Sequence, residues 1–518
     1  MKRTAIALVV LAAAAAASPA AADRPMTLQE CILTALKNNL NLAAELLGPE
    51  IASSALGRAR ESFLPTMSFN AGVQKSNQAS FSWLDAAGQV TTDVNDYQGA
   101  LIQRLPTGAS LTASLYSYKN TTNQSFQLIN PRYGSSLAFD FRQPLLRDAG
   151  FAIARREILI AKNNLEMSEG QLKQALVDTV YNVEEAYWNL VFSRENLRVQ
   201  QESLRLARDL LAKNTKELEA GVIPPIEILN ARAEVAAREA DILQAEAQVR
   251  NDQDTLRTRL NLPREKEEPA SSLIPADLPS TDAVSIGVEE ARAKALVNRP
   301  DLAVSQAGLK TSDLNLRYAR NQTLPNLSFR ATLQSPGVSG TQIQYLDNDP
   351  LSGVIIGTLP AGASTAFKDT FRFKYENWSV RLTFDIPLET ILSRSQVARA
   401  RGEAEQSMLR HKNLEAQALL EVDIAVRAVE TDFQRANAYR AARELAAERL
   451  AAEVKKLEAG LSTNYTVLQQ QRDLTLARTN ETRSRIDYNL SLARLQRAMG
   501  TTLEAKNIRL ADLPDRSN

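Results

Sequence analysis

The fold is decided by residues 176–218, which read LVDTVYNVEEAYWNLVFSRENLRVQQESLRLARDLLAKNTKEL. An apolar heptad sustained over this many turns predicts a long helix that packs as a left-handed coiled coil. We expect it to run from Phe151 to Ala220, on the order of 100 Å at roughly 1.5 Å per residue. Its seam has leucine or valine at every seventh position: Leu176, Val183, Leu190, Leu197, Leu204, Leu211 and Leu218.

The chain turns back directly after this helix. Gly221 suits the left-handed αL conformation, and Pro224 and Pro225 suit the end of one helix and the start of the next. Residues Ile226–Leu260 again have a helical pattern, and their many alanines allow close helix packing. The sequence therefore predicts an antiparallel helical hairpin.

The chain contains an internal duplication, which indicates a repeat architecture. The motif Leu-Pro-x-x-Ser-Phe at Leu64–Phe69 returns at Leu324–Phe329, and the Leu-Glu-Ala-Gly that ends at Gly221 returns at Gly460. Each half is expected to contain a short helix, a second helix, strands, a very long helix, a glycine turn and a last helix. The predicted segments are a signal peptide (1–22), first-repeat helices (23–65), first-repeat strands and external loops (66–143), a long helical hairpin (144–262), a linker (263–282), second-repeat helices (283–325), second-repeat strands and external loop (326–388), a second long hairpin (389–500) and a C-terminal tail (501–518).

The first residues have the features of a secretory signal. Met1–Arg3 is positively charged, residues 5–17 are apolar, and residues 20–22 are alanines of the kind found before a cleavage site. The mature chain is expected to begin at Asp23. The single cysteine, Cys31, excludes an internal disulfide, and its distance from Asp23 argues against a lipid-anchored N-terminus.

The composition points to neither nucleic-acid binding nor catalysis. The formal net charge is +1, and it becomes −1 without Lys2 and Arg3, so there is no basic excess. The single histidine, His411, lies between two basic residues and is expected to be a solvated surface residue. The sequence has no phosphate-binding glycine loop, metal-ligand cluster or nucleophile motif. We therefore expect no enzyme activity, no cofactor and no metal.

Four runs alternate between apolar and polar residues, which predicts half-buried strands. They are residues 67–73, 137–141, 327–333 and 378–386. At about nine residues, such strands have the length needed to cross a bilayer when tilted, with apolar side chains toward lipid. Together with the predicted signal and the lack of a long apolar helix, this favours a membrane β-barrel over a sheet on a soluble core. Aromatic residues near the ends of the runs are expected to form interfacial girdles: Tyr97, Tyr116, Tyr118, Tyr133, Phe373, Tyr375 and Trp378.

Two further alternating runs, 98–105 and 109–117, are joined by Pro106-Thr107-Gly108. They are either an extra membrane hairpin or an external ribbon, and we favour the ribbon, which leaves about four barrel strands per chain. Four strands cannot close a barrel, and an open sheet edge in lipid would leave backbone groups unpaired. Oligomerisation is therefore expected, with three copies supplying twelve strands above a ring of helices.

The sequence resembles the outer membrane efflux protein family, the TolC-like channels. The resemblance rests on the twin Leu-Pro-x-x-Ser-Phe junctions, on the strand exits Phe141–Leu145 and Phe384–Leu388, and on the turns at Gly221 and Gly460. It implies a mainly α, duplicated fold, in which long antiparallel coiled-coil helices form a periplasmic α-barrel below a trimeric outer-membrane β-barrel. It also implies a location in the outer membrane of a Gram-negative bacterium, extending into the periplasm.

The resemblance further implies the function and the partners. The chain is expected to be the passive exit duct of a tripartite efflux or type I secretion system. A homotrimer in outer-membrane lipid would work with a periplasmic membrane-fusion adaptor and an inner-membrane pump of the RND, ABC or MFS type. A non-conducting periplasmic coiled-coil adaptor or scaffold is the alternative. It would explain the heptads and the signal, but not strands of membrane length in matching places of both halves.

The resemblance places the periplasmic tips, where the adaptor docks and the closed pore narrows, at the two helical turns. The residues concerned are Gly221, Val222, Gly460 and Leu461. A plain αL cap between antiparallel helices is the alternative to a docking role.

The expected pore constriction departs from the family pattern. Many members have an acidic residue six positions after the second-turn glycine, often with another three positions later. Thr466 and Gln469 occupy these places here, whereas Glu227 occupies the place equivalent to Thr466 after the first turn. A ring of three Glu227 carboxylates would give a weaker cation preference than a constriction lined by aspartates.

Overall fold

A computed structural model describes residues 24–81, 85, 87–221, 223–262, 273–386 and 391–508. The predicted signal peptide lies outside these residues. The chain divides into two compact units. Unit 1 contains the segments up to Gly48, from Gly170 to Leu302 and from Asn413 onward, and unit 2 contains Pro49–Glu169 and Ala303–Lys412.

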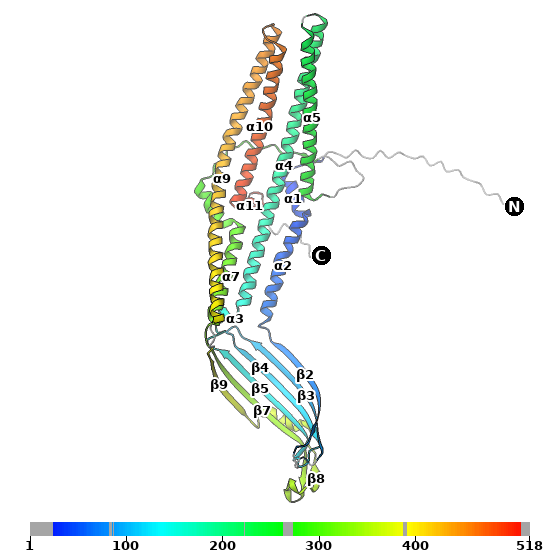
Figure 1. Ribbon diagram of the computed structural model, residues 1–518, viewed down its shortest axis with the longest axis vertical. Coiled ribbons are helices and arrows are strands. Elements are labelled where there is room, and N and C mark those ends of the chain that lie inside the picture. Colours follow the sequence, from blue (N-terminus) through cyan, green and yellow to red (C-terminus); the bar gives the residue numbers. More distant parts are fainter. Residues whose placement is uncertain are drawn as a thin grey trace, which may run out of the picture. The chain divides into compact units, whose positions relative to one another are not determined.

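The two halves of the chain share one order of main elements: a short helix, a second helix, strands, a very long helix and a returning helix (Figure 1). The two longest helices have 64 and 68 residues, and the predicted helix from Phe151 to Ala220 is confirmed apart from a break at Arg155. In the described residues no helix is long and apolar enough to cross a membrane. The first half contains α1 (Leu28–Asn38), α2 (Leu40–Glu61), α3 (Phe151–Ala154), α4 (Arg156–Glu219) and α5 (Pro225–Leu260); the second contains α6 (Val288–Asn298), α7 (Pro300–Gln322), α8 (Ala363–Phe371), α9 (Ile391–Glu458), α10 (Asn464–Ala498) and α11 (Thr502–Ala505).

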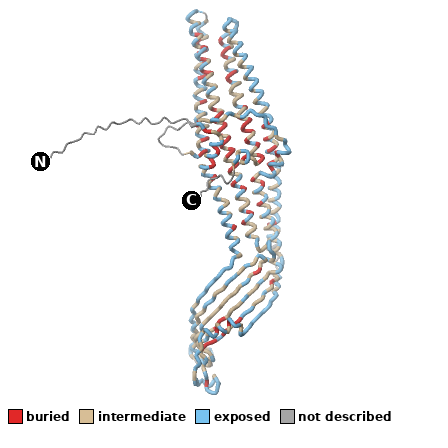
Figure 2. Tube along the Cα trace, turned by 180° about the vertical axis from the view of Figure 1, so that it is seen from behind, coloured by how far each residue is buried: buried red, intermediate tan, exposed pale blue. Residues whose placement is uncertain are grey.

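The core of unit 1 forms around the heptad seam of α4. Leu176, Val183 and Leu190 are almost fully buried there, together with one face of α1. Figure 2 shows this concentration of buried residues in the helices. Cys31 of α1 belongs to the same core, and burial, with smaller contributions from nearby carboxylates, raises the pKa of its thiol to about 12. The thiol therefore stays protonated at neutral pH.

Two buried tyrosines hold the connector between the halves. Strand β6 (Leu273–Pro275) pairs in parallel with β1 (Arg24–Met26). The hydroxyl of Tyr187 in α4 accepts a hydrogen bond from the amide of Asp277 (3.0 Å) and lies 3.0 Å from the Asp277 carboxylate. The Tyr488 hydroxyl in α10 donates to the Asp282 carbonyl (2.6 Å) and accepts from the Val284 amide (3.2 Å). One tyrosine from each hairpin therefore fixes the same connector, but from non-equivalent helices.

Unit 2 contains one antiparallel sheet in the order β2-β3-β4-β5-β7-β9, and β8 also pairs with β7. The four predicted strand runs are confirmed as parts of this sheet. Strands β2 and β9 each have one edge without a partner strand in the described residues. The strands are β2 (Thr66–Ala79), β3 (Gln89–Arg104), β4 (Ser110–Thr122), β5 (Ile129–Pro144), β7 (Asn326–Tyr345), β8 (Ile355–Leu359) and β9 (Asn377–Asp385).

The preference for an external ribbon was wrong, and so was the count of four strands. Strands β3 and β4 lie in the middle of the sheet and pair along nearly their whole length with β2 and β5. Their side chains alternate in phase with those of the neighbouring strands, and the Leu105 amide closes the hairpin on the Ala109 carbonyl (2.8 Å). The chain therefore supplies six long strands to the sheet.

The register gives the sheet one apolar and one polar face. By this register Phe69, Leu115 and Phe139 point to the same face of the sheet. Leu333 and Trp378, on the next two strands, point to that face as well. Many of these side chains are largely exposed, with Phe69 at 70% and Trp378 at 75%. An exposed apolar surface this extensive marks an interaction site.

The opposite face carries polar and charged residues, and it also carries Tyr116 and Tyr118. These two tyrosines therefore do not lie on the apolar face, where an interfacial girdle was expected. Tyr118 instead covers Gly134 of β5 and lies 5.6 Å from the guanidinium of Arg132. Any side chain at position 134 would collide with the Tyr118 ring, so the missing Cβ is needed for this packing.

The Tyr187→Phe variant tests whether the Tyr187 hydroxyl stabilises the connector between the two halves. It leaves the amide of Asp277 without its hydrogen-bond acceptor, and we expect a loss of about 1–3 kcal/mol of local stability. Amide hydrogen exchange over residues 273–287 should become faster. Tyr439→Phe is the control, because no hydrogen bond of the Tyr439 hydroxyl is found among the described residues; equal exchange rates in the two variants would contradict the assignment.

Candidate functional site: hairpin tips and the contacts between hairpins

Both helical hairpins end in a glycine with left-handed backbone. Gly221 and Gly460 each have φ of +74°, which confirms the predicted αL conformation. Their amides donate to the carbonyls of Leu218 (2.9 Å) and Leu457 (3.0 Å). Leu461 is 79% exposed at the second tip, whereas Val222 lies outside the described residues. The two tips are thus close structural equivalents.

The structure places the three constriction candidates in different surroundings. The Thr466 amide donates to the side-chain oxygen of Thr463 (3.4 Å), which caps α10, and Gln469 is exposed. Glu227 is half-buried in the first turn of α5, and its Oε2 is shielded from solvent and has no hydrogen-bond partner among the described residues. In the described chain no hydrogen bond joins Glu227 to Thr466 or Gln469.

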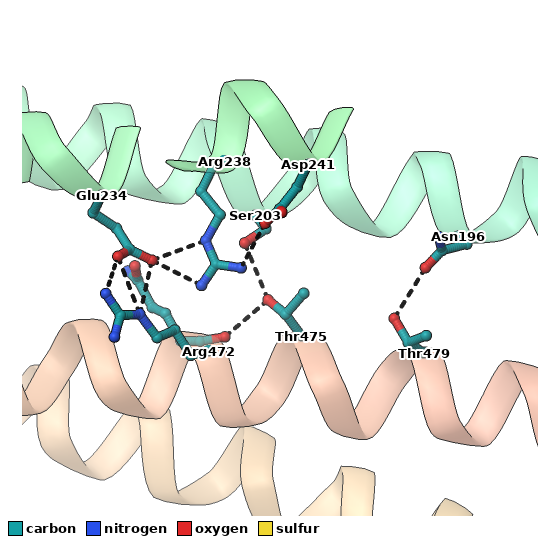
Figure 3. A network of polar contacts seen from close by, with 9 residues as sticks. Asn196, Ser203, Glu234, Arg238, Asp241, Arg472, Thr475 and Thr479 are labelled. Atoms are coloured by element: carbon teal, nitrogen blue, oxygen red, sulfur yellow. Dashed lines mark hydrogen bonds and ion pairs between the residues drawn. The ribbon is translucent and has the colours of Figure 1, made fainter. Parts of the chain in front are cut away.

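A row of polar contacts links the first hairpin to the second, as Figure 3 shows. The Glu234 carboxylate of α5 accepts hydrogen bonds from Arg472 of α10, with 3.1 Å from Nε to each oxygen. Further from the tips, the hydroxyls of Ser203 and Thr475 lie 3.1 Å apart. Beyond them, Thr479 donates to Asn196 Oδ1 at 3.1 Å. We call these three contacts the polar seam.

Glu234 is the most buried charge of the seam, with 4% of its surface exposed. Burial opposes ionisation of this carboxyl, but hydrogen bonds from Arg472 and the charges of Arg238 and Arg472 outweigh it. They hold the pKa of Glu234 below its usual range. Arg238 contributes from the same helix, with 2.9 Å between its Nε and Glu234 Oε1. Both hairpins must therefore stay in place for the carboxylate to remain satisfied.

The tip side of the seam combines apolar packing with unsatisfied polar groups. Leu210 of α4 packs with Val467 and Leu468 of α10 in one buried cluster. Nearby in sequence, Asn214 is fully buried, yet neither side-chain polar atom has a hydrogen-bond partner in the part of the chain that the structure describes. An unsatisfied buried amide costs about 1–3 kcal/mol. The unsatisfied amide of Asn214 therefore offsets part of the stability that the apolar cluster gives to this end of the hairpins.

Sequence reasoning identified the tips but missed the polar seam. Glu234 is one of several glutamates on α5 and Arg472 one of several arginines on α10. The single sequence has no signal for which of these residues meet across two hairpins. No group of His, Cys, Asp or Glu residues in the described chain could hold a metal ion. The polar seam can restrict movement between the two hairpins while its contacts are formed, and can permit movement when they break.

Comparisons with known proteins agree with this architecture. A family model described as outer membrane efflux protein matches residues 110–262 and 291–501. The pyoverdine export outer membrane protein OpmQ of Pseudomonas putida is 30% identical over 162 residues, 31% of this chain and 33% of that protein. The match thus spans about a third of this curated relative.

Solved structures resemble the chain over most of its length. The outer-membrane channel OprN superposes with a TM-score of 0.64 at 16% identity, covering 92% of this chain and 90% of that one. The CmeC outer membrane channel of Campylobacter jejuni superposes with a TM-score of 0.59 at 17% identity, covering 93% and 90%. The predicted fold is therefore confirmed.

Arg472→Gln tests the polar seam. The variant leaves Glu234 buried and ionised with only Arg238 beside it, and we expect a local loss of about 1–3 kcal/mol. Hydrogen exchange of the α10 amides near position 472 should become faster at neutral pH. Because the pKa of Glu234 is lowered, its contribution is present at neutral pH and disappears as pH falls through the folded-state pKa, so the difference should shrink in acid.

Two further variants complete this test. The pair Glu234→Gln and Arg472→Gln, combined, should cost less than the sum of the single changes. Arg208→Gln removes an exposed pair with Glu239 (2.6 Å) and should have an effect below about 1 kcal/mol. Strict additivity, or an equal effect of Arg208→Gln, would show that the seam does not couple the hairpins.

Proposed function

Because the chain belongs to the outer membrane efflux protein family, we propose that it is the subunit of a passive exit duct in the outer membrane. This membership agrees with the resemblance noted in the sequence and with the predicted location in the outer membrane. The observation that carries the proposal is the sheet of unit 2, which has an apolar face, a polar face and two unpaired edges. Copies of the chain would close these edges on one another, and cargo would pass along the polar face.

The strand count changes the size of the proposed barrel. We propose a homotrimer, in which six long strands per chain give eighteen strands in place of the twelve expected from sequence. Barrel diameter grows with strand number, and membrane barrels of 16–18 strands leave an aqueous channel. The proposed lumen is therefore wider than a twelve-stranded barrel would allow.

The proposed partners follow from the hairpins. Adaptor docking is assigned to the tips around Gly221 and Leu461, where an exposed leucine and a weakly packed helix end are available. The inner-membrane pump would be of the RND, ABC or MFS type, and pump and adaptor would select the cargo. Opening would move one hairpin against the other and would break the polar seam.

A periplasmic coiled-coil scaffold fits the observations less well. It needs the hairpins but gives no role to a six-stranded sheet with one apolar face. In water, that face would be an aggregation site. In a bilayer, the same face is covered by lipid.

A pair of neighbouring substitutions in β2 tests the membrane barrel. Phe69→Arg places a charge on the apolar face, at a cost of up to about 2–4 kcal/mol in a bilayer, whereas Asn70→Arg changes the polar face. We expect the parent chain to fractionate with the outer membrane as a heat-modifiable trimer. Phe69→Arg should lower the amount of trimer, and Asn70→Arg should not. Equal behaviour of both variants, or a soluble periplasmic protein, would favour the scaffold.

Glu227→Gln tests the proposed constriction at the tips. Removing three carboxylates per trimer should shift ion selectivity in planar bilayers toward anions, since acidic rings favour cations. The measurement is the reversal potential under a salt gradient, and Glu239→Gln, on an exposed part of α5, is the control. A reversal potential that does not change with Glu227→Gln would exclude this residue from the constriction.

A further inference from the structure

Four arginines share one level of the sheet. Arg142 of β5 pairs with Arg330 of β7, which pairs with Arg381 of β9. On the other side of Arg142, Ser110 of β4 lies between it and Arg104 of β3. Directly paired residues point to the same face, so the four side chains form one line across the sheet. We call this line the arginine row.

The row lies on the polar face. Its neighbours along the strands, such as Phe141 and Leu382, point to the apolar face. The row is also near the end of the sheet that connects to the helices. Arg104 directly precedes the short β3–β4 turn, and Arg381 comes four residues before the end of β9. If the apolar face meets lipid, the row faces the lumen at the base of the barrel.

The arginine row is poorly compensated. Like charges on directly paired residues destabilise a sheet, and adjacent strands are only about 4.8 Å apart. Asp140 is the one carboxylate beside the row in the described strands, and it binds Arg330 at 2.6 Å. No ion pair of Arg104, Arg142 or Arg381 is found among the described residues, and all three residues are exposed. Asp148 and Glu157 line a cavity with Arg104, but each forms an ion pair with a neighbouring arginine, Arg147 and Arg156. Within the strands, four arginines and one aspartate therefore leave three positive charges in excess per chain.

Other charges on this face lie further away. Asp385 comes four residues after Arg381 on β9, about 13 Å along an extended strand, and accepts a hydrogen bond from Asn326 (3.0 Å). Asp96 lies eight residues before Arg104 on β3. At physiological ionic strength the Debye length is about 8 Å, so neither carboxylate cancels the field of the row.

We infer that the arginine row forms a positively charged belt around the lumen and selects for anionic cargo that carries carboxylate or phosphate-like groups. The inference rests on the proposed function, because only a closed duct turns the row into a belt. In a trimer the belt has twelve guanidinium groups. Guanidinium groups bind carboxylate and phosphate oxygens in bidentate fashion, and rings of arginine favour anions in pores. Repulsion between the paired arginines lowers the local stability of the sheet, and such a loss is common at functional sites.

The triple variant Arg104→Gln, Arg142→Gln, Arg381→Gln tests the belt and retains the neutral pair of Arg330 and Asp140. The probe is potassium chloride in planar bilayers at low ionic strength, and the readout is the chloride-to-potassium permeability ratio. We expect the triple variant to lower this ratio at least about twofold, and the difference to shrink at 1 M salt, where the Debye length is about 3 Å. Single-channel conductance and trimer yield report whether the barrel is intact.

Two single variants keep the test independent of folding. Arg142→Gln and Arg132→Gln make the same charge change on the same strand and face, but Arg132 lies at the other end of β5. Arg142→Gln should lower the permeability ratio more than Arg132→Gln. An unchanged ratio in Arg142→Gln and the triple variant, with channels of normal conductance, would overturn the belt alone. A parent protein that forms no channels would overturn the proposed duct itself.

Discussion

The structure depends on one constraint, which is that every backbone hydrogen-bonding group of a sheet must have a partner when the sheet lies in hydrocarbon. Six long strands satisfy each other internally, but the outer edges of β2 and β9 have no partner strand in the described chain. Unpaired groups in lipid cost several kcal/mol each. An apolar sheet face and open edges are compatible only if copies of the chain complete the sheet for one another.

The helices of unit 1 are stabilised by apolar packing in the middle and by a mixture of apolar and polar contacts toward the tips. The heptad seam of α4 buries Leu176 and Leu190 in a continuous core in the middle of unit 1. Toward the tips, apolar packing decreases, Asn214 is buried without a partner, and the hairpins are joined by the polar seam. Contacts made of a few charged and hydroxyl groups can be exchanged for water more easily than an apolar core. Unit 1 thus has an apolar core in its middle, and toward the tips its hairpins are joined by a smaller apolar cluster and by the polar seam.

Much of this architecture could be predicted from sequence, because it depends on periodicity. Local patterns predict the heptads of α4, the αL glycines at positions 221 and 460, and the strand runs at 67–73, 137–141, 327–333 and 378–386. The strand count could not be predicted in the same way. Strands β3 and β4 alternate in the sequence as well, but an inserted hairpin and an external ribbon share this pattern, and only pairing with β2 and β5 distinguishes them.

The turn conformation at Gly221 and Gly460 was predictable from sequence, whereas contacts between distant residues were not. The Glu234–Arg472 contact and the arginine row join residues far apart in sequence, and each partner alone resembles an ordinary solvated charge. Arg142 was part of the Phe141–Leu145 motif that supported the family resemblance, but its alignment with Arg330 and Arg381 needs the register of the sheet.

Cysteine pairs introduced on the outer edges of β2 and β9 test the central claim most directly. The native Cys31 is buried, and its raised pKa keeps it protonated, so introduced thiols supply the reactive groups. Oxidation in the outer membrane should link β2 of one copy to β9 of the next and give covalent dimers and trimers, while cysteines on β4 should give none. Cross-links that form equally well from β4, or a failure of every β2–β9 pair to link, would contradict closure of the barrel through these two edges.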